Sequence, residues 1–268
     1  MNTLRAQALQ LLLTPDPDAK ADATRALDSL AHPVGATDQL AEPSGIPGRP
    51  ALPVLVPHTQ LKHRSVHTRE GRAALLHALA HIEFNAIDLA LDLAWRFAGM
   101  PEPFYRDWIR VAREEALHFS LLRNHLQTLG YRYGDFPAHN ALWEMAEKTR
   151  HDLMARIALV PRTLEARGLD ASPPIRAKLL AAGDTDGAAI LDVILKDEIE
   201  HVAIGNRWYR WLCTREGLDP IATYERMATE YGAPRPRGPF NLEARRAAGF
   251  EEVELAWLAA AQNPRNPP

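Results

Sequence analysis

Apolar residues recur with helical spacing through most of the chain from residue 68 to 217. The pattern predicts four long helical regions whose ends coincide with glycines, prolines or capping residues: about 68–98, 103–130, 139–167 and 185–217. Pro161 interrupts the third region and Gly168 closes it, and Asp184 or Thr185 caps the fourth. Because strand patterns are nearly absent, we predict an all-α protein with a four-helix bundle at its centre.

Segments of different character flank the bundle. Two short helices are predicted at Met1–Leu13 and Ala19–Ala31, the second with Asp18 as its N-cap. Residues 31–60 hold six prolines, which exclude helix and central strand and favour an extended arm packed along the domain over a disordered linker. Two or three short helices near the C-terminus are separated by the loop 232–241. The predicted parts are an N-terminal region of short helices and arm (1–67), the bundle (68–217) and C-terminal helices packed on it (218–268).

Ionisable side chains interrupt the apolar stripes of the first two long helices. Glu83 falls in the middle of the first stripe, and Glu115 and His118 lie on the inward face of the second helix. Glutamate and histidine three residues apart project from the same side of a helix. An unpaired carboxylate in an apolar core is costly, so each of these groups is expected to have a partner of opposite charge.

The second half of the bundle repeats this arrangement. Glu198 and His201 interrupt the inward stripe of the fourth helix at the same spacing, and Glu165 precedes them on an apolar face. A lone core glutamate followed about thirty residues later by Glu-x-x-His therefore occurs twice. This spacing is the bundle-core motif of carboxylate-bridged di-iron and di-manganese sites.

Four carboxylates and two imidazoles suit two divalent cations. Oxygen and imidazole ligands favour Fe(II) or Mn(II), and the four negative charges balance two such ions. We predict two iron ions, two manganese ions or a mixed pair, with Glu115 and Glu198 as the bridging ligands. The alternative is that these residues are surface salt-bridge partners, which would require the apolar stripes to face water.

Neighbouring polar residues are candidates for supporting roles. Asp197 and Glu114 each directly precede a predicted ligand, and a carboxylate there can accept the ring N–H of a histidine on the opposite helix. For Glu114 a solvated charge is the alternative. His77 and His81 lie one turn apart near Glu83 and are expected to have polar supporting or surface roles, although that spacing also allows metal binding.

The amino-acid composition limits which cellular compartment and which kinds of metal site are expected. A single cysteine, Cys213, excludes an intramolecular disulfide framework and any zinc or iron–sulfur site built on several cysteines, as expected in a reducing compartment. The first thirteen residues are too short and polar for a signal peptide, and no apolar run approaches the ~18 residues of a spanning helix. We predict a soluble, cytoplasmic protein without a membrane partner.

The motif residues resemble the ferritin-like di-iron carboxylate superfamily. Within it, the stretches HIEFNAIDLALDLAWRF, REEALHFSLL, ARIALVPRTLEARGLD, KDEIEHVAIGNRWY and RGPFNLEARRAAGF look like one bacterial ferritin-like family of unassigned function. The form Asp197-Glu198-x-x-His201 is similar to that of bacterial di-iron monooxygenases and acyl desaturases. The family also looks distantly related to the tRNA-modifying di-iron hydroxylase that acts on a prenylated adenosine.

The position of Glu165 departs from this pattern, because Glu83 lies in mid-helix whereas Glu165 lies between Pro161 and Gly168. If residues 139–167 formed one straight helix, Glu165 would lie too far along it. In that case the ligand would be one of three other carboxylates: Glu144, Glu147 or Asp152.

The expected function is activation of dioxygen for oxidation or hydroxylation of a small organic substrate, with an external electron donor if the protein is a monooxygenase. A ferroxidase or metal-handling protein is the alternative, and a purely structural metal site is a third reading. A modified nucleoside or tRNA substrate would need basic residues that converge on phosphate, although solvated or internally paired arginines are favoured at a net charge of −3. The candidates are Arg235, Arg237, Arg245 and Arg246 near the late loop, and Arg132, Lys148, Arg150 and Arg156 in the crossover.

The two long segments without helical pattern are expected to lie beside the route to the metals. They are residues 31–60 and 232–241, and long loops of this kind are usually functional or disordered. The alternative is that they only shield apolar helix faces. Asn241 is expected to cap the short helix that follows it.

Overall fold

The computed structural model describes residues 2–261, and within that range the regular structure is helical apart from one isolated bridge between Leu55 and Ala138. The predicted all-α class is therefore confirmed for this part of the chain. The chain divides into two compact units, Met1–Trp143 and Glu144–Pro268, which we describe separately.

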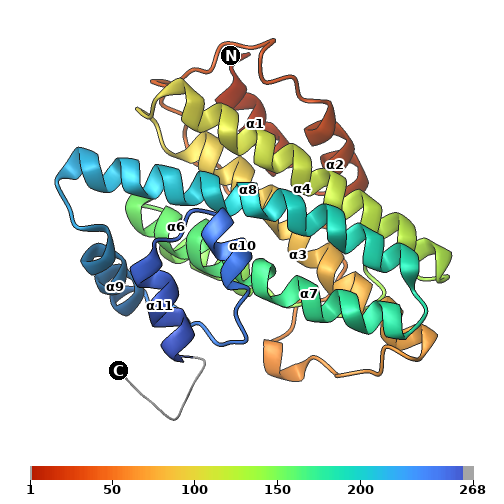
Figure 1. The fold of residues 1–268 in the computed structure, drawn as a ribbon. Helices are drawn as coiled ribbons and strands as arrows, with labels where there is room; N and C mark the ends of the chain where they lie inside the picture. The colour runs from red at the N-terminus through yellow and green to blue at the C-terminus, as the bar shows by residue number, and fades with distance from the viewer. Residues whose placement is uncertain (1, 262–268) are drawn as a thin grey trace. The chain divides into compact units, whose positions relative to one another are not determined.

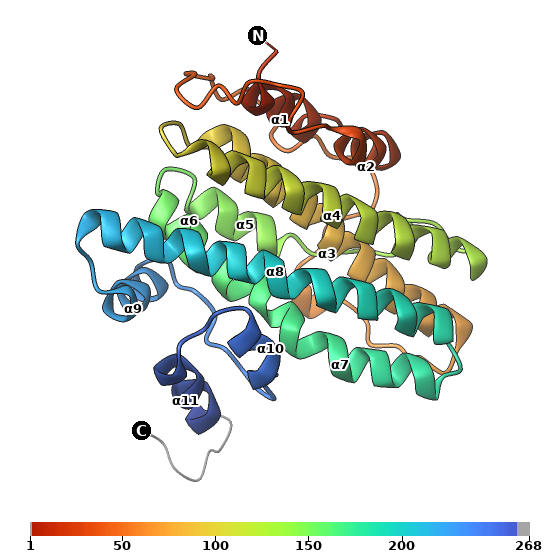
Figure 2. The ribbon, with the colours of Figure 1, turned by 45° about the horizontal axis from the view of Figure 1, so that its top comes forward.

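The first unit is built on two long helices that lie side by side, α3 (Arg69–Arg96) and α4 (Glu102–Thr128) (Figure 1). Thr68 caps α3 through its side chain, and α4 begins at Glu102, one residue before the predicted start at Pro103. Two shorter helices, α1 (Leu4–Leu12) and α2 (Pro17–Ala26), pack on this pair (Figure 2). Apolar and aromatic side chains of α3 and α4 form its buried core, which is why charged groups there stand out.

The second short helix differs from its prediction at both ends. Asp16 caps it, with Oδ1 accepting a hydrogen bond from the backbone N–H of Ala19 at 2.8 Å, whereas Asp18 lies in the first turn. Pro17 occupies the first helical position, where its missing N–H costs nothing. The helix stops at Ala26 and not at Ala31.

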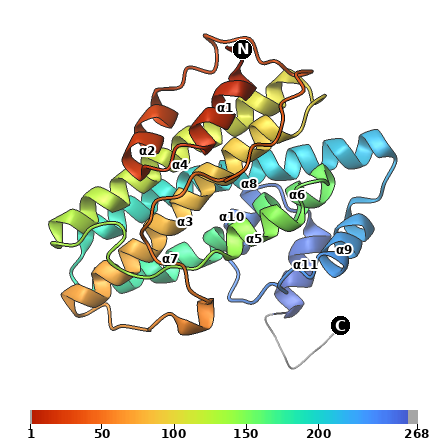
Figure 3. The same ribbon diagram turned by 180° about the vertical axis from the view of Figure 1, so that it is seen from behind.

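The proline-rich arm packs along the first unit, which confirms the prediction of an ordered extended segment (Figure 3). Backbone hydrogen bonds hold it at Gly48, whose N–H donates to Leu12, and at Ala36, whose carbonyl accepts from Gly99. It ends in one short 3-10 turn, η1 (His58–Gln60).

The second unit consists of shorter helices around one long one. The first of them, α5 (Ala141–Lys148), begins in the last residues of the first unit. The others are α6 (Leu153–Leu159), η2 (Val160–Glu165), α7 (Ala166–Ala181), α8 (Thr185–Glu216), α9 (Pro220–Glu230), α10 (Leu242–Ala247) and α11 (Glu252–Ala261). α7 lies beside α8, and α9, α10 and α11 form the predicted C-terminal helices (Figure 1). The predicted caps are present: the side chain of Asp184 caps α8 and that of Asn241 caps α10.

The third helical region is interrupted at Pro161, as predicted, but it does not close at Gly168. Residues Val160–Glu165 form a π-helix, and the chain then continues as α7 to Ala181. Proline lacks the N–H that an α-helix would need, and Thr163 Oγ1 donates to the carbonyl of Ala158 at 2.7 Å, which satisfies a group in the widened turn. The straight-helix alternative is excluded, because the helix breaks between α5 and α6.

A close approach between α8 and the π-helix is possible because residue 205 is glycine. A Cβ atom on Gly205 would lie 2.9 Å from Pro161 Cβ and 3.3 Å from its Cγ. Substituting Gly205→Ala is therefore expected to lower the free energy of unfolding by about 1–3 kcal/mol despite the better helix propensity of alanine. Urea unfolding of the metal-free protein measures this. Gly168→Ala is the matched control: the nearest atom to its Cβ, the carboxyl carbon of Glu198, would be 3.9 Å away, so no loss is expected.

One described helix, α3, is long and apolar enough to cross a membrane by length and composition alone. Glu83, Asp88 and Asp92 interrupt this helix, so it contains no uninterrupted apolar run of the ~18 residues that a spanning helix needs. In the structure, 72% of its most apolar window is buried, as in the core helix of a soluble protein.

Candidate metal centre

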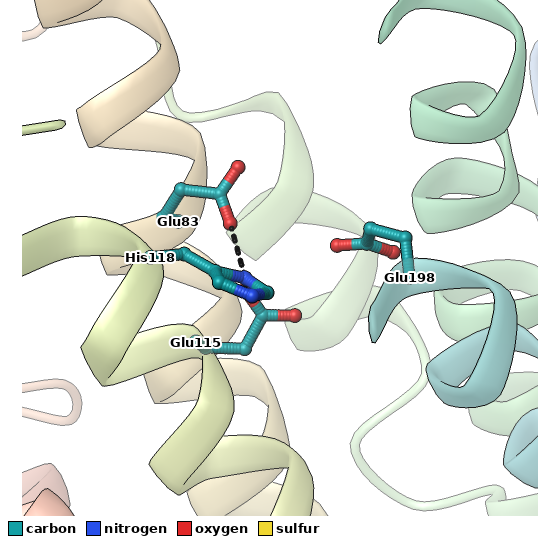
Figure 4. Close-up of side chains that lie close together, drawn as sticks. All are labelled: Glu83, Glu115, His118 and Glu198. Carbon is teal, nitrogen blue, oxygen red and sulfur yellow. Dashed lines mark hydrogen bonds and ion pairs between the residues drawn. The ribbon is translucent and has the colours of Figure 1, made fainter. Parts of the chain in front are cut away.

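The first unit carries a buried cluster of two carboxylates and one imidazole. Glu83 comes from α3, and Glu115 and His118 come from α4, where their three-residue spacing places them on one face. Nδ1 of His118 lies 3.3 Å from an oxygen of Glu83 and 3.3 Å from an oxygen of Glu115 (Figure 4). All three side chains are buried, and each offers a ligand atom within 4.8 Å of the others. A group of this composition could hold a metal ion.

The electrostatics of this cluster favour a bound cation. Burial and the neighbouring Glu115 carboxylate raise the pKa of Glu83 well above its usual value, and the contact with His118 opposes that rise only in part. Two carboxylates this close in an apolar core therefore resist being ionised together. A divalent cation would favour the ionised form of both, since its charge opposes both the repulsion and the cost of burial.

The second unit carries the related pair Glu198 and His201 on α8. Both side chains are buried, with His201 Nδ1 3.9 Å from Glu198 Oε1. Glu165 is the last residue of the π-helix, and it lies one turn before Gly168 in the chain. The carboxyl carbon of Glu198 is 3.9 Å from the position that a Cβ on Gly168 would occupy. The carboxylate of Glu198 thus packs against the start of α7, next to the segment that carries Glu165.

The predicted supporting carboxylates differ in their surroundings. Glu114 is partly exposed and pairs with Arg110 on its own helix at 3.0 Å, as the solvated-charge alternative expects. Asp197 is partly buried. Asp152, an alternative to Glu165, caps α6 by accepting from the N–H of Ala155 at 2.9 Å.

His77 and His81 belong to a buried aromatic and hydrogen-bonded cluster of the first unit. His77 Nε2 accepts from the N–H of Gly134 at 2.9 Å, so its ring proton must be on Nδ1. His81 Nε2 lies 3.2 Å from the carbonyl of His139 and therefore carries its proton, which leaves Nδ1 to accept from the hydroxyl of Tyr133 at 2.8 Å. Burial lowers the pKa of His77 to about 4 and that of His81 to about 3. Both rings are thus held by loop residues of the first unit, and their burial excludes the surface alternative.

The buried histidines predict that the protein loses stability as the pH falls. A histidine whose pKa is lowered on folding binds fewer protons than in the unfolded chain, so the folded state is penalised between about pH 6.5 and its folded pKa of about 4. Substituting His77→Gln is expected to remove about 2 kcal/mol of the stability difference between pH 7 and pH 5. Urea unfolding at both pH values measures this, with the exposed His63→Gln as control. An unchanged pH dependence in the His77 variant would contradict the assignment.

Several of the basic residues considered for nucleic-acid binding are engaged internally. Arg156 is buried and donates to Thr149 Oγ1, and Arg245 is buried and pairs with Asp170. Arg246 pairs with Glu252. These three arginines are thus engaged with groups of the same unit.

Arg162 is a further candidate functional residue that the sequence pattern does not predict, and it is buried in the second unit among aromatic rings. Its signal in the sequence is an arginine inside the apolar stretch from Met154 to Leu164. Such a residue must find a counter-charge or an aromatic environment.

The fold and site define an all-helical protein with a buried carboxylate and histidine cluster that could hold a metal ion. The chain belongs to the family described as "Protein of unknown function (DUF455)", which matches residues 13–256. It is 51% identical over 216 residues to an "Uncharacterized protein" of Haemophilus influenzae, a match that covers 78% of this chain and 75% of the relative. No solved structure matches the chain.

Proposed function

We propose that the protein is a dinuclear iron or manganese oxidoreductase. In this proposal the Glu83, Glu115 and His118 cluster of the first unit joins a second set from the other unit, Glu165, Glu198 and His201, and the six ligands bind two ions. The observation that carries the proposal is the buried Glu-x-x-His pair, which occurs once on α4 and once on α8.

The architecture that we propose is the ferritin-like four-helix bundle. Its helices would be α3, α4, the α6–α7 segment and α8, and its metal ligands would project inward from all four. The π-helix supports this choice for the third position, because such bulges inside helices are frequent at functional sites. Glu165 is the carboxylate that this bulge carries.

The donor set favours redox-active or redox-compatible ions. Carboxylate oxygen and imidazole nitrogen suit Fe(II) and Mn(II), and the described residues of the cluster contain no thiolate, which would favour softer metals. Bound iron would supply the electrons for dioxygen chemistry, whereas the protein holds the ligands in a dry core. We propose dioxygen and a small organic molecule as the reactants, with an external electron donor if the organic substrate is hydroxylated.

Oxygen consumption by the Fe(II)-loaded protein tests the proposed function. We expect about one dioxygen per iron pair in a single burst, with further consumption only when a chemical reductant is added. Oxidation of many added Fe(II) ions per chain without a reductant would instead identify a metal-handling protein. Bound Fe(II) that stays reduced in air would show that the metal has a structural role, and either result would overturn the oxidoreductase proposal.

A further inference from the structure

Two buried arginines line a small cavity in the second unit, and none of the proposed metal ligands is among its lining residues. Arg162 comes from the π-helix and Arg245 from α10, and the cavity has a volume of about 50 Å³. Tyr224, Phe250 and Trp257 contribute aromatic walls. Pro236 of the late loop also lines it, so this loop covers a cavity within its own unit.

The guanidinium of Arg162 lies in an aromatic cage. Its central carbon is 4.9 Å from the ring centroid of Tyr209, 4.8 Å from that of Tyr224 and 5.2 Å from that of Phe250. The side chain is only 5% exposed. Aromatic faces offset part of the cost of burying the charge, and the low dielectric around it strengthens its attraction for an anion.

Arg162 uses only part of its hydrogen-bonding capacity in its contact with the carboxylate of Glu254. Nη2 of Arg162 pairs with Oε1 of Glu254, but Oε2 of Glu254 accepts from the backbone N–H of Glu251 at 3.0 Å, at the start of α11. Nε of Arg162 is buried and has no hydrogen-bond partner among the described residues. A guanidinium presents its donors as a fork that matches both oxygens of a carboxylate, and here one arm of the fork is unused.

Arg245, which also lies over the Phe250 ring, has both arms of its guanidinium fork paired. Asp170 engages it through both oxygens, at 3.0 Å from Nε and 2.6 Å from Nη2. The Phe250 ring centroid is 5.1 Å from the central carbon of this guanidinium, much as it is from that of Arg162. Of the two buried arginines beside the cavity, Arg162 is therefore the one that has a free donor for a further oxyanion.

We propose that this cavity binds the carboxylate of a small aromatic acid. The ligand carboxylate would bind Arg162 and displace the carboxylate of Glu254, which competes for the same guanidinium. A cavity of about 10–15 Å³ holds one water molecule, so 50 Å³ accommodates a carboxylate but not a whole ligand. The aromatic body of the acid would lie against Trp257, which is 49% exposed beside the cavity. This site requires no metal and does not depend on the proposed function.

Calorimetric titration of the metal-free protein with benzoate tests this site. We expect weak binding to the wild type and at least about tenfold tighter binding to the Glu254→Gln variant, because glutamine removes the competing charge while keeping an acceptor for Glu251. Benzamide, which has the same shape without the charge, is expected to bind neither protein. Glu252→Gln is the matched control, since Glu252 lies on the same helix and pairs with Arg246 instead.

The double variant Glu254→Gln, Arg162→Gln is expected to lose benzoate binding. If it fails to fold, the comparison between Glu254→Gln and Glu252→Gln still decides the question. Absence of benzoate binding to the wild type and to Glu254→Gln, equal binding of benzamide, or equal affinities in the two single variants would overturn the proposal.

Discussion

The Glu115→Gln variant is expected to bind Fe(II) at least about 100-fold more weakly than the wild type, since replacing only a residue that supports a ligand already costs 10–100-fold. Glu115 is fully buried, and His118 touches both it and Glu83, so one change alters the whole cluster of the first unit. Anaerobic titration with Fe(II) against a competing chelator measures the affinity.

The adjacent Glu114→Gln variant is the matched control. Glu114 differs from Glu115 by one position on α4, but it is partly exposed and pairs with Arg110. Its Fe(II) affinity is expected to equal that of the wild type. The metal-free Glu115→Gln protein should also be at least as stable as the metal-free wild type, because a neutral amide relieves the repulsion that raises the pKa of Glu83. Equal Fe(II) affinity in the two variants would refute the cluster as a metal site.

The Glu198→Gln variant is expected to reduce the metal content from two ions to at most one. Glu198 is a proposed metal ligand from the second unit. Without its negative charge, two cations would have too few carboxylates to balance them. Elemental analysis after loading with iron or manganese and desalting gives the stoichiometry. Glu200→Gln, two residues along α8 and exposed, is the control that should keep both ions. Two retained ions in the Glu198 variant would exclude this residue as a ligand.

The sequence alone predicts where the long helices lie and which of their ionisable side chains face inward. Apolar periodicity locates α3, α4 and α8 to within a few residues, because long amphipathic helices carry many repeats of the signal. The same pattern places Glu83, Glu115 and Glu198 on inward faces, and all three are buried.

Local choices between similar signals were harder to predict. Asp16 and Asp18 are both acceptable caps, and Pro17, which suits the first helical position, is the sequence signal that favours Asp16. The sequence predicts a helix end at Gly168, but this residue lies inside α7, where a Cβ would be 3.9 Å from the carboxyl carbon of Glu198 and an alanine would fit as well. Whether a glycine ends a helix or lies inside one cannot be decided without knowing the neighbouring elements.

The aromatic cage of Arg162 could not be predicted from the sequence, because its parts are dispersed along the chain. Tyr209, Tyr224 and Phe250 come from α8, from α9 and from the segment before α11, respectively. No local spacing relates them. The arginine itself was visible as a charge in an apolar stretch, but its partners were not.

The central claim is that six side chains from the two units hold a pair of metal ions. A crystal structure of the iron-loaded protein, with anomalous scattering recorded at the iron edge, tests it most directly. We expect two anomalous peaks about 3.5–4 Å apart. Their ligands should be Glu83, Glu115, His118, Glu165, Glu198 and His201. A single peak, no peak, or peaks bound by other residues would contradict the account.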